Sequence, residues 1–377
     1  MFGNIPLLGK ERANIQALKI LQERGADILF ATNERWGHEA IQPLLDKLGL
    51  RWRPIPVARP LRKAMSTSDL IGVVRDIIAG WWGLFSLARQ FQPTHIHTMN
   101  EYQTLYNLPV LRLLRRPIIY RLGDAPIETP RLLGVLWRWF VAPSVSTFVC
   151  ISEFIKAEAM GAGVPEEKIR VIYNYPPERL AHYETDKTAA PWEGKTVLYV
   201  GQISKEKGVD LLIEMATTLC EERTDVRFLL AGNYSWNNPF AENLIQRVEA
   251  LGLSHRIVFL GYVDDVPSLL NSADIHVCPS VGKEALSNVV PEAKQASVPS
   301  VVFPSGGLPE LVVAQGEDGW VCKGKTVEAL RAGIEHYLGM GVEELEAAGR
   351  AARRSMEALG ITKEHFAEQW MEVYDAV

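Results

Sequence analysis

Short apolar runs alternate along the chain with longer amphipathic stretches. In the longer stretches, such as 11–25 and 210–223, apolar residues recur at helical spacing. The short runs are rich in β-branched residues and nearly uninterrupted, which is typical of strands covered on both faces of a sheet. Strands separated by helices predict βαβ units with parallel sheets, and therefore an α/β fold. The predicted strands are 26–32, 93–99, 116–122, 146–152, 195–201, 226–232, 256–261, 274–280 and 299–305.

One polar segment interrupts this alternation near the middle of the chain. It has neither helical nor strand periodicity, and it contains a proline and a glycine. We interpret it as the linker between two doubly wound, Rossmann-like domains that face each other. Ligands of such sheets bind at the carboxyl ends of the strands, so the cleft between the domains is the expected site. The predicted parts are domain 1–178, linker 179–194, domain 195–360 and a last helix, 361–377, able to cross back to the first domain.

The first domain opens unusually. A doubly wound domain should begin with a strand, followed by a glycine-bearing turn and a helix. Here the turn and helix begin almost at Met1. We therefore expect the first strand to be only a few residues long or missing from this sequence.

Composition narrows the class of protein without naming it. Of 377 residues, 47% are hydrophobic and 23% charged, as in soluble globular proteins of about two domains. No run of about 18 uncharged apolar residues predicts a spanning helix, and the charged start MFGNIPLLGKER does not resemble a signal peptide. The four cysteines are widely spaced, which predicts buried free thiols in a reducing compartment. We therefore expect a cytoplasmic protein.

Charge is unevenly distributed. Residues 1–178 carry 22 Lys and Arg against 16 Asp and Glu, whereas the remainder is strongly acidic. This asymmetry weakly indicates an anionic partner for the first half, or is a chance property of a solvated surface. Segments 77–85, 110–116 and 131–143 mix Arg, Trp and bulky apolar residues. That mixture fits helices at the inner face of a membrane, bound peripherally, and equally fits helices buried against a sheet.

The strongest candidate site lies in residues 274–319. Glu284 follows a strand, and a helix carrying Glu292 is expected to begin at Ser287 or Asn288. Two such carboxylates could accept hydrogen bonds from pairs of sugar hydroxyls, while the N-terminus of the helix offers N–H groups to phosphate. The alternative is two surface glutamates beside an ordinary helix start, because this spacing is common by chance.

The surrounding motifs resemble those of the retaining glycosyltransferases of family 4, which have the GT-B fold of two facing Rossmann-like domains. The resemblance covers about 195–325 well and the first domain more weakly, through an approximate Gly-Gly-x-Glu turn at Gly9. The motifs are Glu284-x7-Glu292, Gly306-Gly307-Leu308-Pro309-Glu310, Gly316-Glu317-Asp318-Gly319, and the set Gly201, Lys207 and Gly208.

The resemblance implies roles for the matched residues. Glu292 is expected to bind the ribose of the nucleotide, and Glu284 the hydroxyls of the donor sugar. Lys207 is expected to neutralise the diphosphate as it leaves. The catalytic candidates are then Glu284, Lys207 and Asp124. The further donor-binding candidates are Gly9, Gly201, Gln202, Lys205, Leu286, Ser287, Asn288 and Val289.

No metal or cofactor is implied, because the family uses Lys or Arg and a helix dipole where other enzymes use a divalent cation. Asp264-Asp265 is the most metal-like pair in the sequence. Its position before a short apolar segment favours a helix cap over a pair of metal ligands.

Two positions depart from the family pattern. Gln202 replaces an Arg that contacts phosphate and supplies no charge, so that Lys205 becomes the candidate replacement. Gly123-Asp124 stands where the family often has His-Asp, which leaves recognition of the donor sugar open. Arg121, Gly123 and His97 are candidate cleft residues, although His97 also fits a satisfied core histidine.

These observations predict a hexosyltransferase that moves a hexose-type sugar from a nucleoside diphosphate, with UDP favoured, to an acceptor hydroxyl. By resemblance the anomeric configuration is retained, and the product belongs to glycan, glycolipid or surface polysaccharide synthesis. The first domain is expected to bind a glycan, a lipid-linked acceptor or a small molecule, and no nucleic acid. The alternatives are a nucleotide-sugar epimerase on the same fold and a catalytically impaired partner subunit that binds a nucleotide sugar.

Overall fold

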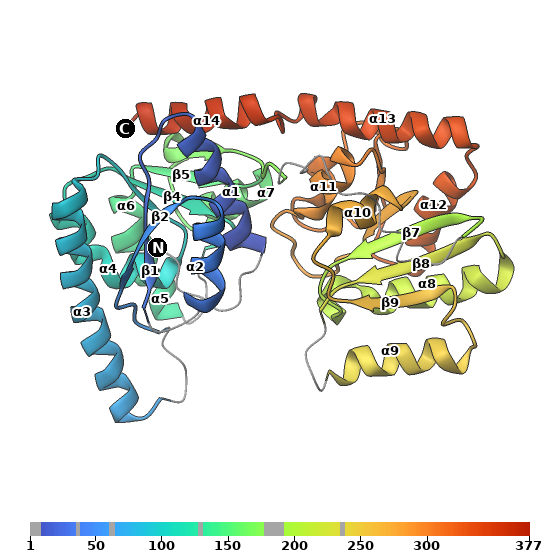
Figure 1. Cartoon of the computed structure of the whole chain (residues 1–377), viewed down its shortest axis with the longest axis horizontal. Helices are drawn as coiled ribbons and strands as arrows, with labels where there is room; N and C mark the ends of the chain where they lie inside the picture. The colour runs from blue at the N-terminus through green and yellow to red at the C-terminus, as the bar shows by residue number, and fades with distance from the viewer. Residues whose placement is uncertain (1–8, 35–37, 60–64, 127–130, 177–191, 234–237) are drawn as a thin grey trace. The chain divides into compact units, whose positions relative to one another are not determined.

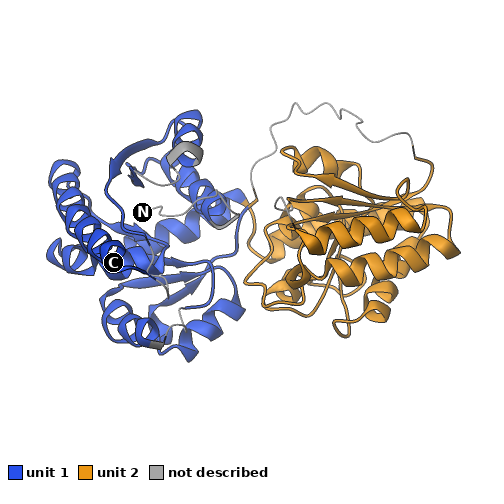
Figure 2. Ribbon diagram, turned by 90° about the horizontal axis from the view of Figure 1, so that it is seen from below, with its two compact units in different colours: residues 1–175, 363–377 blue, residues 176–362 orange. Residues whose placement is uncertain are grey.

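The computed structural model describes residues 9–34, 38–59, 65–126, 131–176, 192–233 and 238–377. The chain divides into two compact units (Figure 2). Unit 1 comprises Met1–Tyr175 together with Lys363–Val377, and unit 2 comprises Pro176–Thr362.

Unit 1 is built on parallel strands that pair in two groups, β1 with β2 and β3-β4-β5-β6. Neighbouring residues of these strands point to opposite faces. Ile119 and Val149 pack towards α1 and α14, whereas Phe148 contacts Trp137 on the other face. The strands are β1 (Leu29–Asn33), β2 (Arg51–Ile55), β3 (Ile96–Thr98), β4 (Ile118–Leu122), β5 (Thr147–Cys150) and β6 (Ile169–Val171).

Helices cover both faces of these strands (Figure 1). One face packs against α1, α2 and α14, and the other against α3, α4 and the turn η1. The helices are α1 (Gly9–Glu23), α2 (His38–Lys47), α3 (Thr67–Phe91), α4 (Glu101–Leu113), α5 (Arg131–Leu136), α6 (Ala142–Ser144), α7 (Glu153–Gly161) and α14 (Lys363–Asp375), with a π-turn η1 (Trp137–Val141) and a 3-10 turn η2 (Glu166–Lys168).

The last helix belongs to unit 1 although it follows all of unit 2 in the sequence. Figure 1 shows α14 lying beside α1, and the two helices contact each other. Phe366, Trp370 and Val373 are buried in the core that α14 shares with α1 and β1. The apolar face of this helix is therefore satisfied inside unit 1.

Unit 2 holds a six-stranded parallel sheet in the order β12-β11-β10-β7-β8-β9. This is the order of a complete Rossmann sheet, and the strand order reverses between β7 and β10. Its interior strands are almost entirely buried, as expected for a sheet with helices on both faces. The strands are β7 (Lys195–Val200), β8 (Val226–Ala231), β9 (Ile257–Gly261), β10 (Ile275–Cys278), β11 (Ser300–Val302) and β12 (Gly319–Val321).

Helices of unit 2 pack on both sides of the sheet. Helices α8 and α12 contact each other over one buried cluster, and α11 packs against α13. Gly349 of α13 allows this approach, because a Cβ there would lie 2.1 Å from the carbonyl oxygen of Ser297. The helices are α8 (Val209–Glu222), α9 (Pro239–Ala250), α10 (Val266–Asn271), α11 (Val289–Gln295), α12 (Val327–Leu338) and α13 (Val342–Ala358), with 3-10 turns η3 (Lys205–Lys207) and η4 (Leu308–Leu311).

The predicted class, two Rossmann-like parallel α/β domains, is confirmed. Every predicted strand is present, and the four cysteines are buried and free. The pattern missed β2, β6 and β12, which are short or polar. The expectation for a first strand before Gly9 and most of the predicted linker lie outside the described residues.

One helix departs from the expectation that no segment could span a membrane. Among the described residues, α3 is long and apolar enough to cross a bilayer, by length and composition alone. It carries Arg75 and Asp76 near its middle, and one face packs against α4 and β2. Because Arg75 and Asp76 interrupt its apolar residues, this helix contains no uncharged apolar run of about 18 residues.

Candidate functional site

The site in unit 2 forms where the strand order reverses. The neighbouring parallel strands β7 and β10 end at Val200 and Cys278. The loops that follow them emerge at the same edge of the sheet and diverge to helices on opposite sides. Ligands of open α/β sheets bind in the crevice that such a reversal creates. The loop after β7 carries Lys207, and the loop after β10 carries Glu284.

Lys207 and Glu284 meet at this crevice although 77 positions separate them in the sequence. The Nζ of Lys207 lies 2.5 Å from Oε2 of Glu284. The Oγ of Ser280 donates to the same oxygen at 3.0 Å. The side chain of Glu284 is 16% exposed and that of Lys207 is 35% exposed, so both reach solvent. The structure therefore brings together the two residues predicted to act on the donor.

Backbone contacts fix the two loops against each other. The N–H groups of Val281 and Gly282 donate to the carbonyl oxygen of Glu206 at 3.0 and 2.9 Å. Gly208 follows directly in a left-handed conformation, with φ of 68°. A Cβ at Gly208 would lie 2.0 Å from the carbonyl oxygen of Pro279. Only glycine permits this approach, which holds Lys207 next to the loop of Glu284.

The Gly-Gly motif contacts the backbone of Glu284. The N–H of Gly307 donates to the carbonyl oxygen of Glu284 at 2.9 Å. Gly306 has φ of 54°, and a Cβ there would lie 1.9 Å from that same oxygen. The motif therefore clamps the backbone of Glu284 and sets the direction of its carboxylate. Sequence reasoning read this motif as part of a signature and did not predict its mechanical role.

Replacing Gly306 with alanine should displace Glu284 while leaving the fold intact. The added Cβ both clashes with the backbone of Glu284 and strains a left-handed residue, at a cost of about 1–2 kcal/mol. If Glu284 acts on the donor as the sequence predicts, turnover should fall about tenfold or more, with a smaller change in thermal stability. Gly324→Ala is the matched control, because a Cβ there meets nothing within 4 Å. Equal turnover in the two variants would contradict the clamp.

Lys325 is a neighbouring residue that the sequence did not single out. Its Nζ donates to the carbonyl oxygen of Val281 at 2.9 Å and to Oγ of Ser305 at 3.3 Å. Ser305 in turn donates to the carbonyl oxygen of Gly282. These contacts support the loop that carries Glu284. Lys325 follows β12, one of the strands that periodicity did not reveal, so no motif marked it.

The helix predicted after this loop is α11, and Asn288 is its N-cap. Asn288 itself makes no side-chain capping bond, whereas Oγ of Ser287 accepts from the N–H of Val289 at 3.2 Å. Leu286 and Ser287 are buried, while Val289 and Glu292 are partly exposed. Glu292 lies on this helix, as expected, in its first turn. Helix α11 is short, with seven residues.

A buried network around Asp318 holds α11 in place. Asp318 belongs to the motif Gly316-Glu317-Asp318-Gly319. Asp318 accepts from Nζ of Lys294 at 2.7 Å, and from the N–H groups of Val313 and Ala314 at 3.1 and 2.7 Å. Lys294 also donates to Oγ of Ser355 on α13 at 2.6 Å. Burial alone would raise the pKa of Asp318, but these donors hold it below its ordinary value. This buried network supports the helix that carries Glu292.

The remaining predicted positions of unit 2 lie on the loop after β7. Gly201 follows the strand directly, and a Cβ there would meet the hydroxyl of Tyr199 at 2.7 Å. Gln202 and Lys205 are exposed. The Oη of Tyr199 donates to the carbonyl oxygen of Gln202 at 2.7 Å. Gly9, also predicted to contact the donor, is the first residue of α1 in unit 1.

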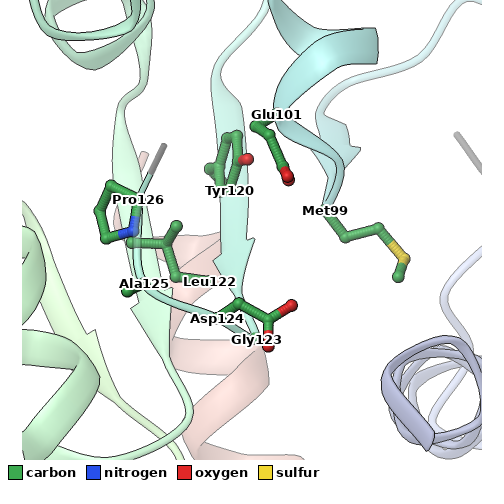
Figure 3. Close-up of a pocket in the computed structure, with 8 residues that line it drawn as sticks. All are labelled: Met99, Glu101, Tyr120, Leu122, Gly123, Asp124, Ala125 and Pro126. Carbon is green, nitrogen blue, oxygen red and sulfur yellow. The ribbon is translucent and has the colours of Figure 1, made fainter. Parts of the chain in front are cut away.

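A small pocket in unit 1 contains both residues of the predicted Gly-Asp pair. Figure 3 shows Gly123 and Asp124 at the end of β4, with Glu101 at the start of α4 beside Tyr120. Burial, and then the negative charge of Glu101, hold the pKa of Tyr120 well above its ordinary value. Asp124 is exposed at the mouth. The pocket is lined by Met99, Glu101, Tyr120, Leu122, Gly123, Asp124, Ala125 and Pro126.

Arg121 and His97, the other candidate cleft residues, lie in the packed face of unit 1. Arg121 is buried and donates to Oδ1 of Asn174 at 2.5 Å, and burial lowers its pKa to about 10. The two ring nitrogens of His97 lie 2.8 Å from Oη of Tyr374 and 3.0 Å from Oδ1 of Asn14. Burial lowers the pKa of His97 to about 3. His97 thus joins α1, β3 and α14, which is the core role that its sequence also allowed.

The described part of the chain gathers no group of three His, Cys, Asp or Glu side chains that could hold a metal ion. Asp265 is the N-cap of α10, and its Oδ1 accepts from the N–H of Ser268 at 3.0 Å. The residues at the Lys207–Glu284 crevice include one cation and one carboxylate, a set suited to an anionic, hydroxyl-bearing ligand.

Comparison with known proteins matches both units. The family model described as Glycosyltransferase Family 4 matches residues 9–175, and that described as Glycosyl transferases group 1 matches residues 184–355. The phosphatidyl-myo-inositol mannosyltransferase of Mycobacterium leprae (strain TN) is 31% identical over 300 residues, or 76% of this chain and 74% of that protein. The chain therefore belongs to glycosyltransferase family 4.

Other matches agree with this assignment. Spore coat protein SA of Bacillus subtilis (strain 168) is 29% identical over 185 residues, which are 48% of this chain and 48% of that protein. The chain thus spans about half the length of several of the curated relatives it matches. The crystal structure of Anabaena Alr3699/HepE in complex with UDP superposes with a TM-score of 0.80 at 18% identity, covering 99% of this chain and 98% of that one. This likeness establishes the GT-B fold.

Proposed function

We propose that the protein transfers a hexose-type sugar from a nucleoside diphosphate to an acceptor hydroxyl. The observation that carries the proposal is the contact between Lys207 and Glu284 at the β7–β10 crevice. In this arrangement Glu284 accepts hydrogen bonds from the donor sugar, and Lys207 stabilises the negative charge that develops on the departing diphosphate.

UDP is the favoured nucleotide. The complex of the structurally similar Anabaena protein with UDP supports this choice, because both chains share the GT-B fold along nearly their whole length. The acceptor is assigned to unit 1, with the pocket at Gly123 and Asp124 as its entry point and Asp124 as the catalytic candidate there. Retention of the anomeric configuration, independence of metal and a cytoplasmic location are part of the proposal. The buried free thiols support a reducing compartment.

A panel of nucleotide sugars tests this proposal. UDP-, GDP- and ADP-sugars are incubated with candidate acceptors, with and without EDTA, and release of the nucleoside diphosphate is measured. NMR of the product then gives its anomeric configuration. Acceptor-dependent release that resists EDTA is the expected result. An epimerase would convert the donor sugar without an acceptor, and an impaired subunit would bind a donor without releasing its nucleotide.

Glu292→Ala should weaken nucleotide binding more than it slows turnover at saturating donor. A carboxylate that accepts hydrogen bonds from two ribose hydroxyls contributes about 1.5–3 kcal/mol to the free energy of binding. Its loss should therefore raise the Kd for the nucleotide about 10- to 100-fold. Calorimetry measures the change. Glu346→Gln, on the exposed face of α13, is the matched control. If Glu292→Ala binds the nucleotide as the control does, the ribose role of Glu292 is wrong.

A further inference from the structure

Unit 1 exposes a concentration of large apolar side chains. Of the sixteen that the described residues expose, ten lie between Leu70 and Phe140. They fall into two groups, which we call the α3 face and the η1 face. The α3 face consists of Leu70, Ile71, Val74, Ile78 and Trp82, and the η1 face consists of Leu113, Leu132, Val135, Trp139 and Phe140.

The α3 face has helical order. Ile71, Val74, Ile78 and Trp82 recur at intervals of three or four residues and therefore share one side of α3. Trp82 is 71% exposed and Ile71 is 66% exposed. The opposite side of α3 packs on the domain through Val73, Gly80 and Leu84. Only 17% of the most apolar window of this helix is buried, so most of its apolar surface has no partner within the described part of the chain.

The two faces belong to one layer of helices. Helix α3 contacts α4, and α4 contacts η1. Figure 1 shows α3 as the outermost helix of this layer in unit 1. Trp139 and Phe140 are exposed at the turn η1, on the other flank of α4. The outer surface of the layer therefore carries apolar side chains on both sides of α4.

Positive charge accompanies the apolar side chains. Arg112, Arg115, Arg116 and Arg138 are exposed beside the η1 face. Residues 102–123 and 129–152 contain no Asp or Glu. The two acidic residues of α3 are engaged, since Asp69 forms the capping box with Ser66, and buried Asp76 pairs with Arg75 at 3.1 Å. This surface thus offers cations and apolar groups with little compensating negative charge.

We propose that this outer layer of unit 1 docks peripherally on an anionic lipid bilayer. Exposed Trp and branched apolar residues enter the boundary between headgroups and acyl chains, and the arginines meet the lipid phosphates. A second copy of the chain fits less well, because a symmetric contact would set the same arginines against each other. The proposal does not depend on the sugar-transfer activity.

The helix lies on the bilayer and does not cross it. Its inner side is fixed to the domain by specific contacts. The Nε1 of Trp81 donates to the carbonyl oxygen of Tyr106 at 2.7 Å, and a Cβ on Gly80 would lie 2.9 Å from the carbonyl oxygen of Pro56. Crossing a membrane would break these contacts and expose buried Asp76 to hydrocarbon.

Vesicle flotation of the full chain tests the proposal. Vesicles of phosphatidylcholine alone are compared with vesicles that also contain phosphatidylglycerol, at low and high salt. We expect flotation with the anionic vesicles, weakened by salt because screening shortens the reach of the arginines. Absence of flotation with anionic vesicles overturns the proposal. Equal flotation with both vesicle types overturns it as well, since charge would then have no part.

Variants of the α3 face and the η1 face test whether these are the surfaces that bind the vesicles. Ile78→Ser/Trp82→Ser and Trp139→Ser should each lower the vesicle partition coefficient about tenfold or more. Arg115→Glu/Arg116→Glu should abolish the preference for anionic vesicles. Val342→Ser removes an equally exposed apolar side chain from unit 2 and should leave flotation unchanged. All variants are checked for unchanged thermal unfolding and nucleotide binding. If the control lowers flotation as much as the unit 1 variants do, or if Trp82→Ser instead dissociates a dimer, the proposed surface is wrong.

Discussion

Lys207→Ala should lower kcat about 10²- to 10³-fold with little change in the Kd of the nucleotide sugar. Its ammonium group is the cation that the structure places against Glu284, at the crevice where a diphosphate would leave. Removing one group that stabilises developing negative charge typically costs about that much in rate. The ground-state diphosphate retains the backbone N–H groups near Ser287, which explains the smaller effect on binding. Steady-state kinetics with a saturating acceptor measures both quantities.

A double-mutant cycle separates this role from mere loss of charge. In the proposed function Lys207 and Glu284 act on adjoining groups of one donor, the diphosphate and the sugar, and they contact each other directly in the structure, so their effects should not add. Glu284→Gln should also lower kcat more than it lowers affinity, and the double variant should be little slower than the worse single variant. Lys323→Ala, an exposed lysine in the same unit, is the control. Strictly additive losses would contradict a shared site.

Lys294→Met should lower the free energy of unfolding of unit 2 by about 3–5 kcal/mol. Lys294 is fully buried and binds Asp318 and Ser355, so its loss leaves a buried carboxylate without its cation. Hydrogen exchange of α11 and α13 peptides in increasing urea measures the change within unit 2. Lys323→Met, at an exposed position, should change the free energy of unfolding by less than about 0.5 kcal/mol.

The double variant Lys294→Met/Asp318→Asn tests whether the unpaired carboxylate of Asp318 causes this loss of stability. Removing both charges leaves no unpaired ion, so it should be more stable than Lys294→Met alone. It should remain less stable than the parent protein, because an amide oxygen cannot replace both carboxylate oxygens that accept from Val313 and Ala314. A double variant less stable than Lys294→Met would show that the carboxylate needs no partner.

Much of this fold could be predicted because its strands are buried on both faces. Continuous apolar runs such as IHVC in β10 mark a covered parallel strand wherever they occur. The strand β2 was not predicted, because it lies at the edge of its sheet and is not covered in this way. Arg51 and Arg53 are exposed there, and Pro54 is tolerated only where no ladder bond is needed on one side. Edge strands carry too few apolar residues to show their period.

The candidate site was predictable in its residues but not in its mechanics. The motif order indicated Lys207 and Glu284, and the chain order of a doubly wound sheet explains why they meet. Spacing could not reveal that Gly306 clamps the backbone of Glu284, because that contact depends on a left-handed residue and a close approach. Nor could it choose between core and cleft for His97, since the deciding partner, Tyr374, lies 277 positions away.

The most direct test of the central claim is calorimetric titration of the intact protein with UDP, GDP and ADP. We expect saturable binding of one nucleotide, with UDP favoured, that persists in EDTA and is weakened by Glu292→Ala but not by Glu346→Gln. If none of the three nucleotides binds, the assignment of the β7–β10 crevice as a nucleotide-sugar site is contradicted.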